Sequence, residues 1–140
     1  MSIFLVRPNK LINTLSEKLK EYDNIRPPEG SEYWKTAYFK EKAPVDSENF
    51  WYIRCASILR KVRKHGPIGV NRLRKKYGGK YVAKRGKKKA AKASGKIIRV
   101  ALQQLEDANL LKLKEREGRV CTPDGVSLLE RTAYEINRNK

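Results

Sequence analysis

The sequence predicts a mainly helical, winged-helix-like fold with a short β-hairpin as the wing and additional helices toward the N-terminus. Apolar residues recur at helical spacing in several separate segments, and two short strand-like runs flank a four-residue turn late in the chain. Gly and Pro residues separate these segments. With 140 residues, of which 39% are hydrophobic, the chain has the size and composition of a single domain, 1–140.

The first third of the chain predicts one helix followed by irregular structure. A helix is expected over 8–22, because Pro8 suits the first turn and Ile12, Leu15, Leu19 and Tyr22 form one apolar stripe. The stretch 24–31 is expected to be a turn or linker. Residues 33–38 indicate either a short helix or an irregular apolar segment.

The clearest helix is predicted over 49–64. Its apolar stripe consists of Trp51, Cys55, Ile58, Leu59 and Val62. The rest of its circumference is cationic. Trp51 is expected to lie in the core and not to stack on a base, because aromatic residues at helical spacing usually pack inward. Gly66-Pro67 ends the helix, and a short helix follows over 70–76 with Leu73 facing inward.

A lysine-rich segment separates these helices from the next one. The stretch 80–93 has few large apolar groups and is expected to form a flexible basic loop. Ser94 is a candidate N-cap for a helix over 96–110, with Ile98, Ala101, Leu102 and Leu105 inward. On its outward face the spacing places Lys96, Arg99 and Gln103.

The C-terminal part predicts the wing and a last helix. Leu111 to Lys114 and Arg119 to Cys121 are expected to pair as a β-hairpin around 115–118. Thr122 is the expected N-cap of the final helix, with Pro123 at its first position. The apolar stripe of that helix consists of Val126, Leu129, Ala133 and Ile136.

Positive charge is concentrated in the middle of the chain. The net charge is +18, and the stretch 49–105 contains no Asp or Glu but 18 of the 33 Lys and Arg residues. The other 15 basic residues are matched by the 15 acids, so both flanks are neutral overall. Ordinary surfaces intersperse the two signs, and an acid-free stretch of this length therefore indicates a polyanionic partner, with nucleic acid favoured.

Other functional classes find little support. No apolar run approaches the roughly 18 residues of a membrane span, and 3–6 is too short for a signal peptide. Cys55, Cys121 and His65 do not have the spacing of a metal site, and the sequence contains no catalytic constellation and no cofactor motif. The two cysteines are expected to be reduced intracellular thiols, with a disulfide between them as the alternative.

The candidate RNA-binding residues are lysines and arginines in two settings. Loop lysines are mobile point charges suited to phosphate neutralisation, whereas helical arginines present planar heads that bridge phosphates or stack on bases. The candidates are Arg54, Arg60, Lys61, Lys64, Arg72, Arg74, Lys75, Lys76, Lys80, Lys84, Arg85, Lys87, Lys88, Lys89, Lys92, Lys96 and Arg99.

A distinctive motif runs from Phe50 to Arg60, Phe-Trp-Tyr-Ile-Arg-Cys-Ala-Ser-Ile-Leu-Arg. It resembles the aromatic–aromatic–Tyr–x–Arg–x–Ala–Ser–x–x–Arg helix of the archaeal and eukaryotic small-subunit ribosomal protein family numbered nineteen. Further matches are Pro27-Pro28-Glu29, Lys35-Thr36, Gly69-Val70, Tyr77-Gly78-Gly79, Ser94-Gly95, Ile98-Arg99, 102–106, Gly118-Arg119, Thr122-Pro123 and Gly125. The chain departs from the family pattern at Gly30, at Arg63 and in the lysine-rich stretch 80–92.

The resemblance implies a non-enzymatic constituent of the small-subunit head that binds ribosomal RNA and supports pre-rRNA processing and subunit maturation. Its partners would be small-subunit ribosomal RNA and neighbouring ribosomal proteins, with no membrane, cofactor or small-molecule substrate. The location would be the cytoplasmic ribosome, and the nucleolus during assembly in a eukaryote. Arg54, Arg60 and Arg99 match basic positions of the family. The alternative from the residues is a winged-helix DNA-binding regulatory or chromatin protein, which would place 96–110 in a major groove.

Overall fold

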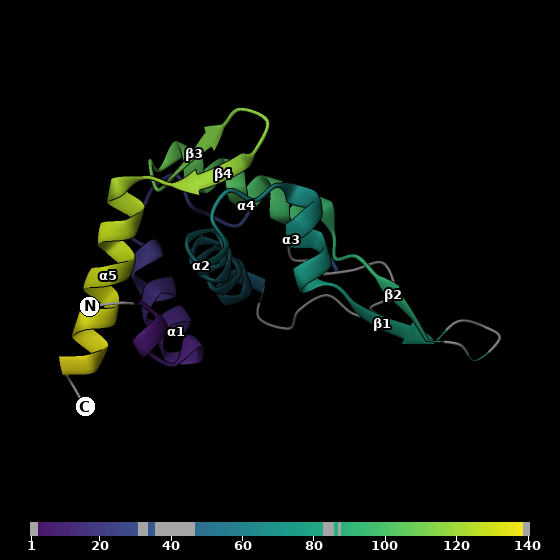
Figure 1. Cartoon of the computed structure of the whole chain (residues 1–140), viewed down its shortest axis with the longest axis horizontal. Coiled ribbons are helices and arrows are strands. Elements are labelled where there is room, and N and C mark those ends of the chain that lie inside the picture. Colours follow the sequence, from purple (N-terminus) through teal and green to yellow (C-terminus); the bar gives the residue numbers. More distant parts are fainter. Residues whose placement is uncertain (1–2, 31–33, 36–46, 83–85, 87, 139–140) are drawn as a thin grey trace.

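A computed structural model describes residues 3–30, 34–35, 47–82, 86 and 88–138 (Figure 1). In chain order the elements are a 3₁₀ turn (Ile3–Leu5), α1 (Pro8–Leu19), α2 (Ser47–His65), α3 (Val70–Tyr77), β1 (Gly79–Val82), β2 (Lys88–Ala91), α4 (Gly95–Asp107), β3 (Leu111–Lys114), β4 (Gly118–Cys121) and α5 (Pro123–Arg138). The predicted mainly helical, winged-helix-like architecture is confirmed.

Helix α2 is the centre of the fold, because α1, α4 and α5 all pack against it. Its apolar stripe is buried as predicted, and Trp51 is 1% exposed. Helix α1 ends at Leu19, three residues before the predicted end, and Tyr22 packs against the core only partly buried. Of the stretch 33–38, only Trp34 and Lys35 lie within the described residues.

The wing is tied to the segment between α2 and α3. Strands β3 and β4 pair antiparallel, with Leu111 opposite Cys121 and Lys114 opposite Gly118. Ile68 adds a bridge to β4: its N–H donates to the Arg119 carbonyl at 3.2 Å, and the Arg119 N–H donates back at 2.9 Å. Gly118 has φ +109°, and a Cβ there would lie 2.5 Å from the Ile68 carbonyl oxygen. Glycine is therefore required where the wing passes this backbone.

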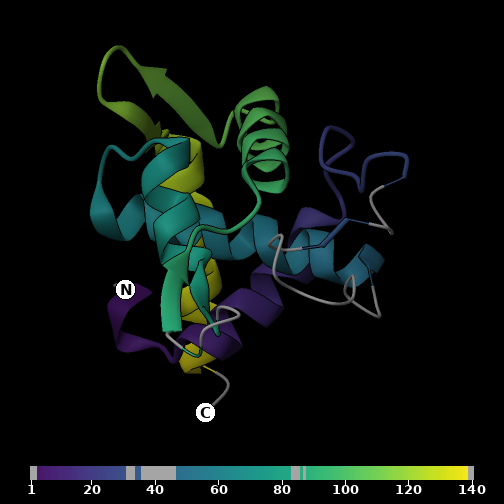
Figure 2. The ribbon, with the colours of Figure 1, turned by 90° about the vertical axis from the view of Figure 1, so that its right-hand side faces the viewer.

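A two-stranded ribbon occupies part of the stretch that the sequence predicted as a loop. Strands β1 and β2 pair antiparallel with Gly79 opposite Ala91, and the ribbon extends away from the helices (Figure 1). In Figure 2 the ribbon points toward the viewer. The prediction was wrong for these strands because Lys88 and Lys89 carry no apolar alternation. Pairing between the two backbones, which no local pattern in the sequence indicates, makes this segment extended.

Candidate nucleic-acid interface

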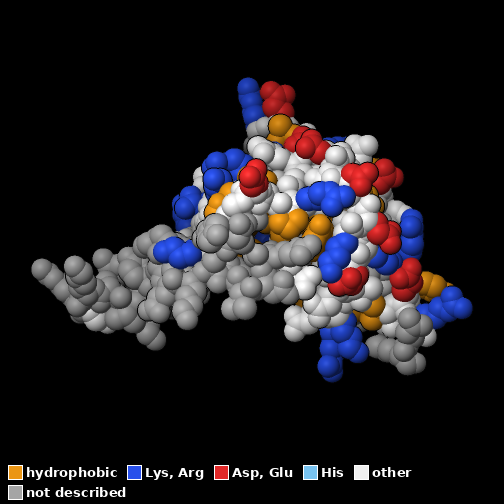
Figure 3. Space-filling view, turned by 180° about the vertical axis from the view of Figure 1, so that it is seen from behind, with side chains coloured by type: hydrophobic (Ala, Val, Ile, Leu, Met, Phe, Trp, Pro, Cys, Tyr) orange, Lys and Arg blue, Asp and Glu red, His pale blue; other side chains and the backbone are white. Residues whose placement is uncertain are grey.

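The ion pairs of the described residues lie outside the acid-free stretch 49–105. Among the described residues the ion pairs are Lys18–Glu135, Lys20–Glu17, Arg26–Asp23, Lys114–Glu117 and Arg119–Glu106. None of these side chains comes from 49–105. On the face seen in Figure 3, acids and bases are interspersed over the helical body. Among the described side chains, the cations without an ion pair in this stretch therefore lie on α2, on α3, at Lys92 and at the start of α4.

The predicted RNA-binding residues differ in exposure. The exposed ones are Lys64, Arg72, Lys75, Lys76, Lys92, Lys96 and Arg99, and the partly buried ones are Arg54, Arg60, Lys61 and Arg74. Lys84, Arg85 and Lys87 lie outside the described residues, and for Lys80, Lys88 and Lys89 only the strand backbone is described.

Several of these cations line three hollows that share residues. One hollow is lined by Arg72, Lys75 and Lys76 beside His65, a second by Lys75 and Lys92, and a third by Arg74, Lys92 and Lys96. The shared residues make one continuous surface from the end of α2 across α3 to the start of α4. We call it the cationic face, and it consists of His65, Arg72, Arg74, Lys75, Lys76, Lys92 and Lys96.

Arg54 is partly buried against two aromatic rings. Its guanidinium carbon lies 5.0 Å from the centroid of the Phe50 ring and 4.1 Å from that of Tyr77. Burial lowers the pKa of Arg54, and Tyr77 partly offsets this effect. The sequence predicted an outward-facing arginine, but cation–π contact with a ring from α3 draws the side chain against the helix pair.

Tyr77 joins α3 to α2 through several side chains. Its hydroxyl lies 2.5 Å from the Ser57 hydroxyl, and the Lys61 ammonium lies 5.1 Å from its ring centroid. Burial raises the pKa of Tyr77, whereas partial burial and the nearby Arg60 lower the pKa of Lys61. The last residue of α3 thereby contacts two cations of α2, Arg54 and Lys61.

Arg74 and Ser94 define the junction between the ribbon and α4. The Arg74 Nε donates to the Ala93 carbonyl at 2.9 Å, and the Arg74 side chain packs over Gly95. Ser94 occupies the N-cap position, but its hydroxyl makes no capping hydrogen bond. The prediction of Ser94 as a capping side chain is therefore wrong. In contrast, the Thr122 hydroxyl accepts the Gly125 N–H at 3.1 Å and caps α5 as predicted.

His65 is exposed at the C-terminal end of α2. It also lines a hollow of about 720 Å³ against the wing tip, where Arg116 and Glu117 lie. Desolvation and the ammonium groups of Lys76 and Lys64 lower the pKa of His65. An anion bound in this hollow would raise the pKa of His65 again.

Sequence reasoning missed the aromatic side chains that orient the cations. Trp34 lies under the Lys96 ammonium, which is 4.5 Å from its ring centroid, and Tyr77 lies beside Arg54. The i, i+4 spacing of Phe50 and Arg54 was a signal for one of these contacts. The other contacts join segments distant in sequence, and periodicity carries no information about them.

The described residues contain neither a metal-ligand cluster nor a membrane-spanning helix. Within the described ranges no three His, Cys, Asp or Glu side chains gather as metal ligands, and no helix is long and apolar enough to cross a membrane. Cys55 and Cys121 are both free thiols, and burial raises the pKa of Cys121 to about 11. A thiol protonated at neutral pH is a poor nucleophile.

Comparison with known proteins identifies the family. The family model for ribosomal protein S19e matches residues 2–139. The chain is 43% identical to the small ribosomal subunit protein eS19 of Haloarcula marismortui, over 96% of this chain and 90% of that protein. It is 42% identical to the Aeropyrum pernix protein of that name, over 90% and 83%, and 38% identical to eS19B of Drosophila melanogaster, over 90% and 81%. This chain therefore belongs to the ribosomal protein S19e family.

Proposed function

We propose that this chain is a structural constituent of the small ribosomal subunit, and that it acts as a single RNA-binding domain whose cationic face contacts ribosomal RNA. Its relatives carry the name of a small ribosomal subunit protein, which supports the ribosomal role. The contact with RNA is inferred from charge and geometry.

The observation that carries the proposal is the acid-free cationic face. Lys75 and Lys76 on α3, together with Lys92 after the ribbon, are exposed and come from a segment without a carboxylate. Each cation that neutralises a phosphate releases a condensed counterion, which favours binding and makes it depend on salt. Arg60 and Arg99 are the helical arginines proposed to bind RNA beside this face.

The finer assignments follow from the family resemblance. They are a position in the subunit head, support of pre-rRNA processing and maturation, and contacts with neighbouring ribosomal proteins. The flank formed by α1 and α5 suits protein contacts, because its charges are balanced and Lys18 pairs with Glu135 at 2.8 Å. The location follows as the ribosome in the cytoplasm, with a nucleolar stage during assembly in a eukaryote.

The second candidate is a winged-helix DNA-binding protein. The observation that favours it is the winged-helix unit formed by α2, Ile68, α3, α4 and the β3–β4 wing. In this unit Arg99 and Gln103 are exposed on α4, where a recognition helix would present them to DNA. Ribosomal RNA is the better fit because the cations also cover α3 and the ribbon base. A single helix inserted in a groove would leave those cations unused.

Sucrose-gradient sedimentation of cell extract tests the proposal. Stoichiometric migration with small subunits that survives a moderate-salt wash supports a ribosomal constituent. Release into light fractions at low salt, or migration with chromatin, supports the DNA-binding alternative.

A further inference from the structure

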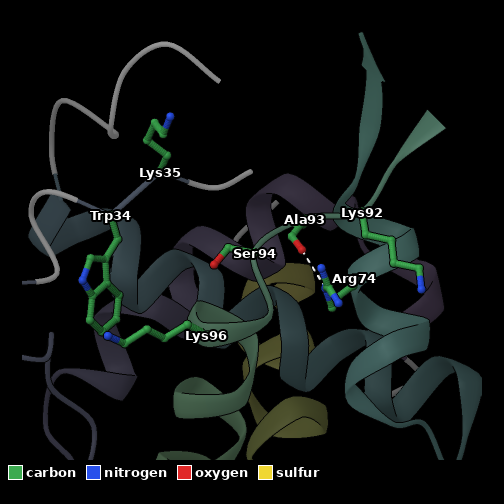
Figure 4. A pocket seen from close by; sticks show the side chains of 7 residues that line it. All are labelled: Trp34, Lys35, Arg74, Lys92, Ala93, Ser94 and Lys96. Carbon is green, nitrogen blue, oxygen red and sulfur yellow. Dashed lines mark hydrogen bonds between the residues drawn. The ribbon is translucent and has the colours of Figure 1, made fainter. Parts of the chain in front are cut away.

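A hollow of about 360 Å³ lies where α4 begins beside Trp34 (Figure 4). Its charged and polar lining consists of Lys35, Arg74, Lys92, Ser94 and Lys96. Among the described residues that line it there are four cations and no acid, a composition that attracts an anionic group. This volume is at the lower end of the range for small-ligand sites. It is more space than a bare anion requires.

Two of the cations are already held in position. The Lys96 ammonium lies 4.5 Å from the Trp34 ring centroid, and the Arg74 Nε is bonded to the Ala93 carbonyl at 2.9 Å. A ligand that binds these groups loses less side-chain entropy than one that must first order free lysines.

Hydrogen-bond donors remain available in the hollow. In the described part of the chain, the terminal nitrogens of Arg74 and the hydroxyl of Ser94 have no hydrogen-bond partner. Figure 4 shows the Ser94 hydroxyl between Trp34 and Arg74. A guanidinium with free terminal N–H groups matches the geometry of a phosphate.

Trp34 adds an apolar wall to the cationic lining. Its indole is partly buried and meets Trp51 edge-on, with ring centroids 6.3 Å apart. Inorganic phosphate gains nothing from such a wall, whereas the sugar and base of a nucleotide do. The lining therefore offers cations for the phosphate of a nucleotide and an apolar wall for its sugar and base.

We propose that this hollow binds one nucleotide of an unpaired RNA strand. Its phosphate lies toward Arg74, Ser94 and Lys92, and its nucleoside lies toward Trp34. This inference rests on the proposed RNA-binding function and adds a defined site to it. An unpaired strand is required because a nucleotide within a duplex has its base stacked and paired, and cannot enter a hollow beside a tryptophan.

The two tryptophans provide an internal comparison for the test. The ¹⁵N-labelled full chain has one indole N–H signal from Trp34 and one from Trp51, which is buried and donates to Gln104 at 2.8 Å. Titration with single-stranded hexauridylate at low salt is expected to shift the Trp34 signal to saturation. The Trp51 signal is expected to move much less.

Matched variants then measure the contribution of the hollow by fluorescence anisotropy of labelled hexauridylate. Lys96→Gln is expected to weaken binding about tenfold, since it removes one held charge. Lys10→Gln removes the same charge from an exposed position on α1 and should change the affinity less than about twofold. Trp34→Leu should weaken the binding of RNA more than it weakens the binding of inorganic phosphate.

The outcomes separate this inference from the proposed function. If hexauridylate shifts signals of α2 and α3 but not Trp34, the hollow is not a nucleotide site and the RNA-binding function stands. If no signal moves at low salt, both are contradicted. If inorganic phosphate shifts Trp34 as strongly as RNA at equal phosphate concentration, the site takes a free anion and the nucleotide assignment is wrong.

Discussion

Trp51 donates its indole N–H to the Gln104 side-chain oxygen at 2.8 Å. The same amide accepts the Arg26 N–H at 3.2 Å and donates to the Arg26 carbonyl at 2.8 Å. One glutamine on α4 thus joins α2 to the segment that follows α1. This contact positions α2 against α4, the two helices at whose ends the cationic face begins and finishes.

Replacing Gln104 should therefore destabilise the fold. Gln104→Ala removes three hydrogen bonds and leaves the indole N–H of the buried Trp51 without its partner, at a cost of about 1–3 kcal/mol in the free energy of unfolding. Urea unfolding measures this cost. Gln103→Ala is the matched control, because Gln103 is exposed and its loss should change stability by less than about 0.5 kcal/mol.

Arg54 should contribute more to stability than to RNA contact. Arg54→Ala loses the contacts with the Phe50 and Tyr77 rings, and we expect a loss of about 1–2 kcal/mol. The control is Arg99→Ala, at an exposed position on α4 where the melting temperature should barely change. Unchanged stability in Arg54→Ala together with weakened RNA binding would show that Arg54 contacts RNA directly.

Alanine substitutions at two glycines distinguish the cost of backbone strain from the cost of a steric clash. Gly118 and Gly30 both have positive φ, but a Cβ at Gly118 would meet the Ile68 backbone, whereas a Cβ at Gly30 has nothing within 4 Å. Gly30→Ala should cost about 1 kcal/mol through strain alone. Gly118→Ala should cost more, because the wing must move away from Ile68. Equal losses in thermal unfolding would mean that the wing contact contributes nothing.

The sequence was sufficient for the features that depend on local periodicity. The stripe through Trp51 and Leu59 identified the central helix, and the β3–β4 hairpin and the Thr122 cap followed from short-range patterns. It was insufficient where tertiary pairing decides the outcome. The pairing of β1 with β2 and the contact between Arg54 and Tyr77 require partners that no local pattern identifies.

His65 should act as a reporter of the cationic face. It is the one histidine of the chain, and its pKa should be lower than the ordinary value of about 6.5 in the free protein. Because the folded pKa is lowered, the contribution of His65 to stability is complete above the unfolded pKa and is lost as the pH falls through the folded pKa. NMR titration of the imidazole measures this directly.

The surrounding charges provide the control for that titration. Lys76→Gln removes a contributing cation and should move the His65 pKa back toward its ordinary value, whereas Lys112→Gln on the wing should leave it unchanged. Bound RNA should raise the pKa of His65, since phosphate replaces cationic repulsion with attraction. A His65 pKa that RNA does not alter would place the phosphate backbone away from this end of the face.

The central claim is that the cationic face attaches this protein to the small subunit. Lys76→Glu reverses an exposed charge of the cationic face, Arg99→Glu reverses one beside it, and Lys10→Glu makes the same change on α1. The most direct measurement is incorporation of each tagged variant into small subunits in competition with the unaltered protein. We expect at least about a tenfold reduction for Lys76→Glu and Arg99→Glu, and near-normal incorporation for Lys10→Glu. Equal incorporation of all three variants would contradict the claim.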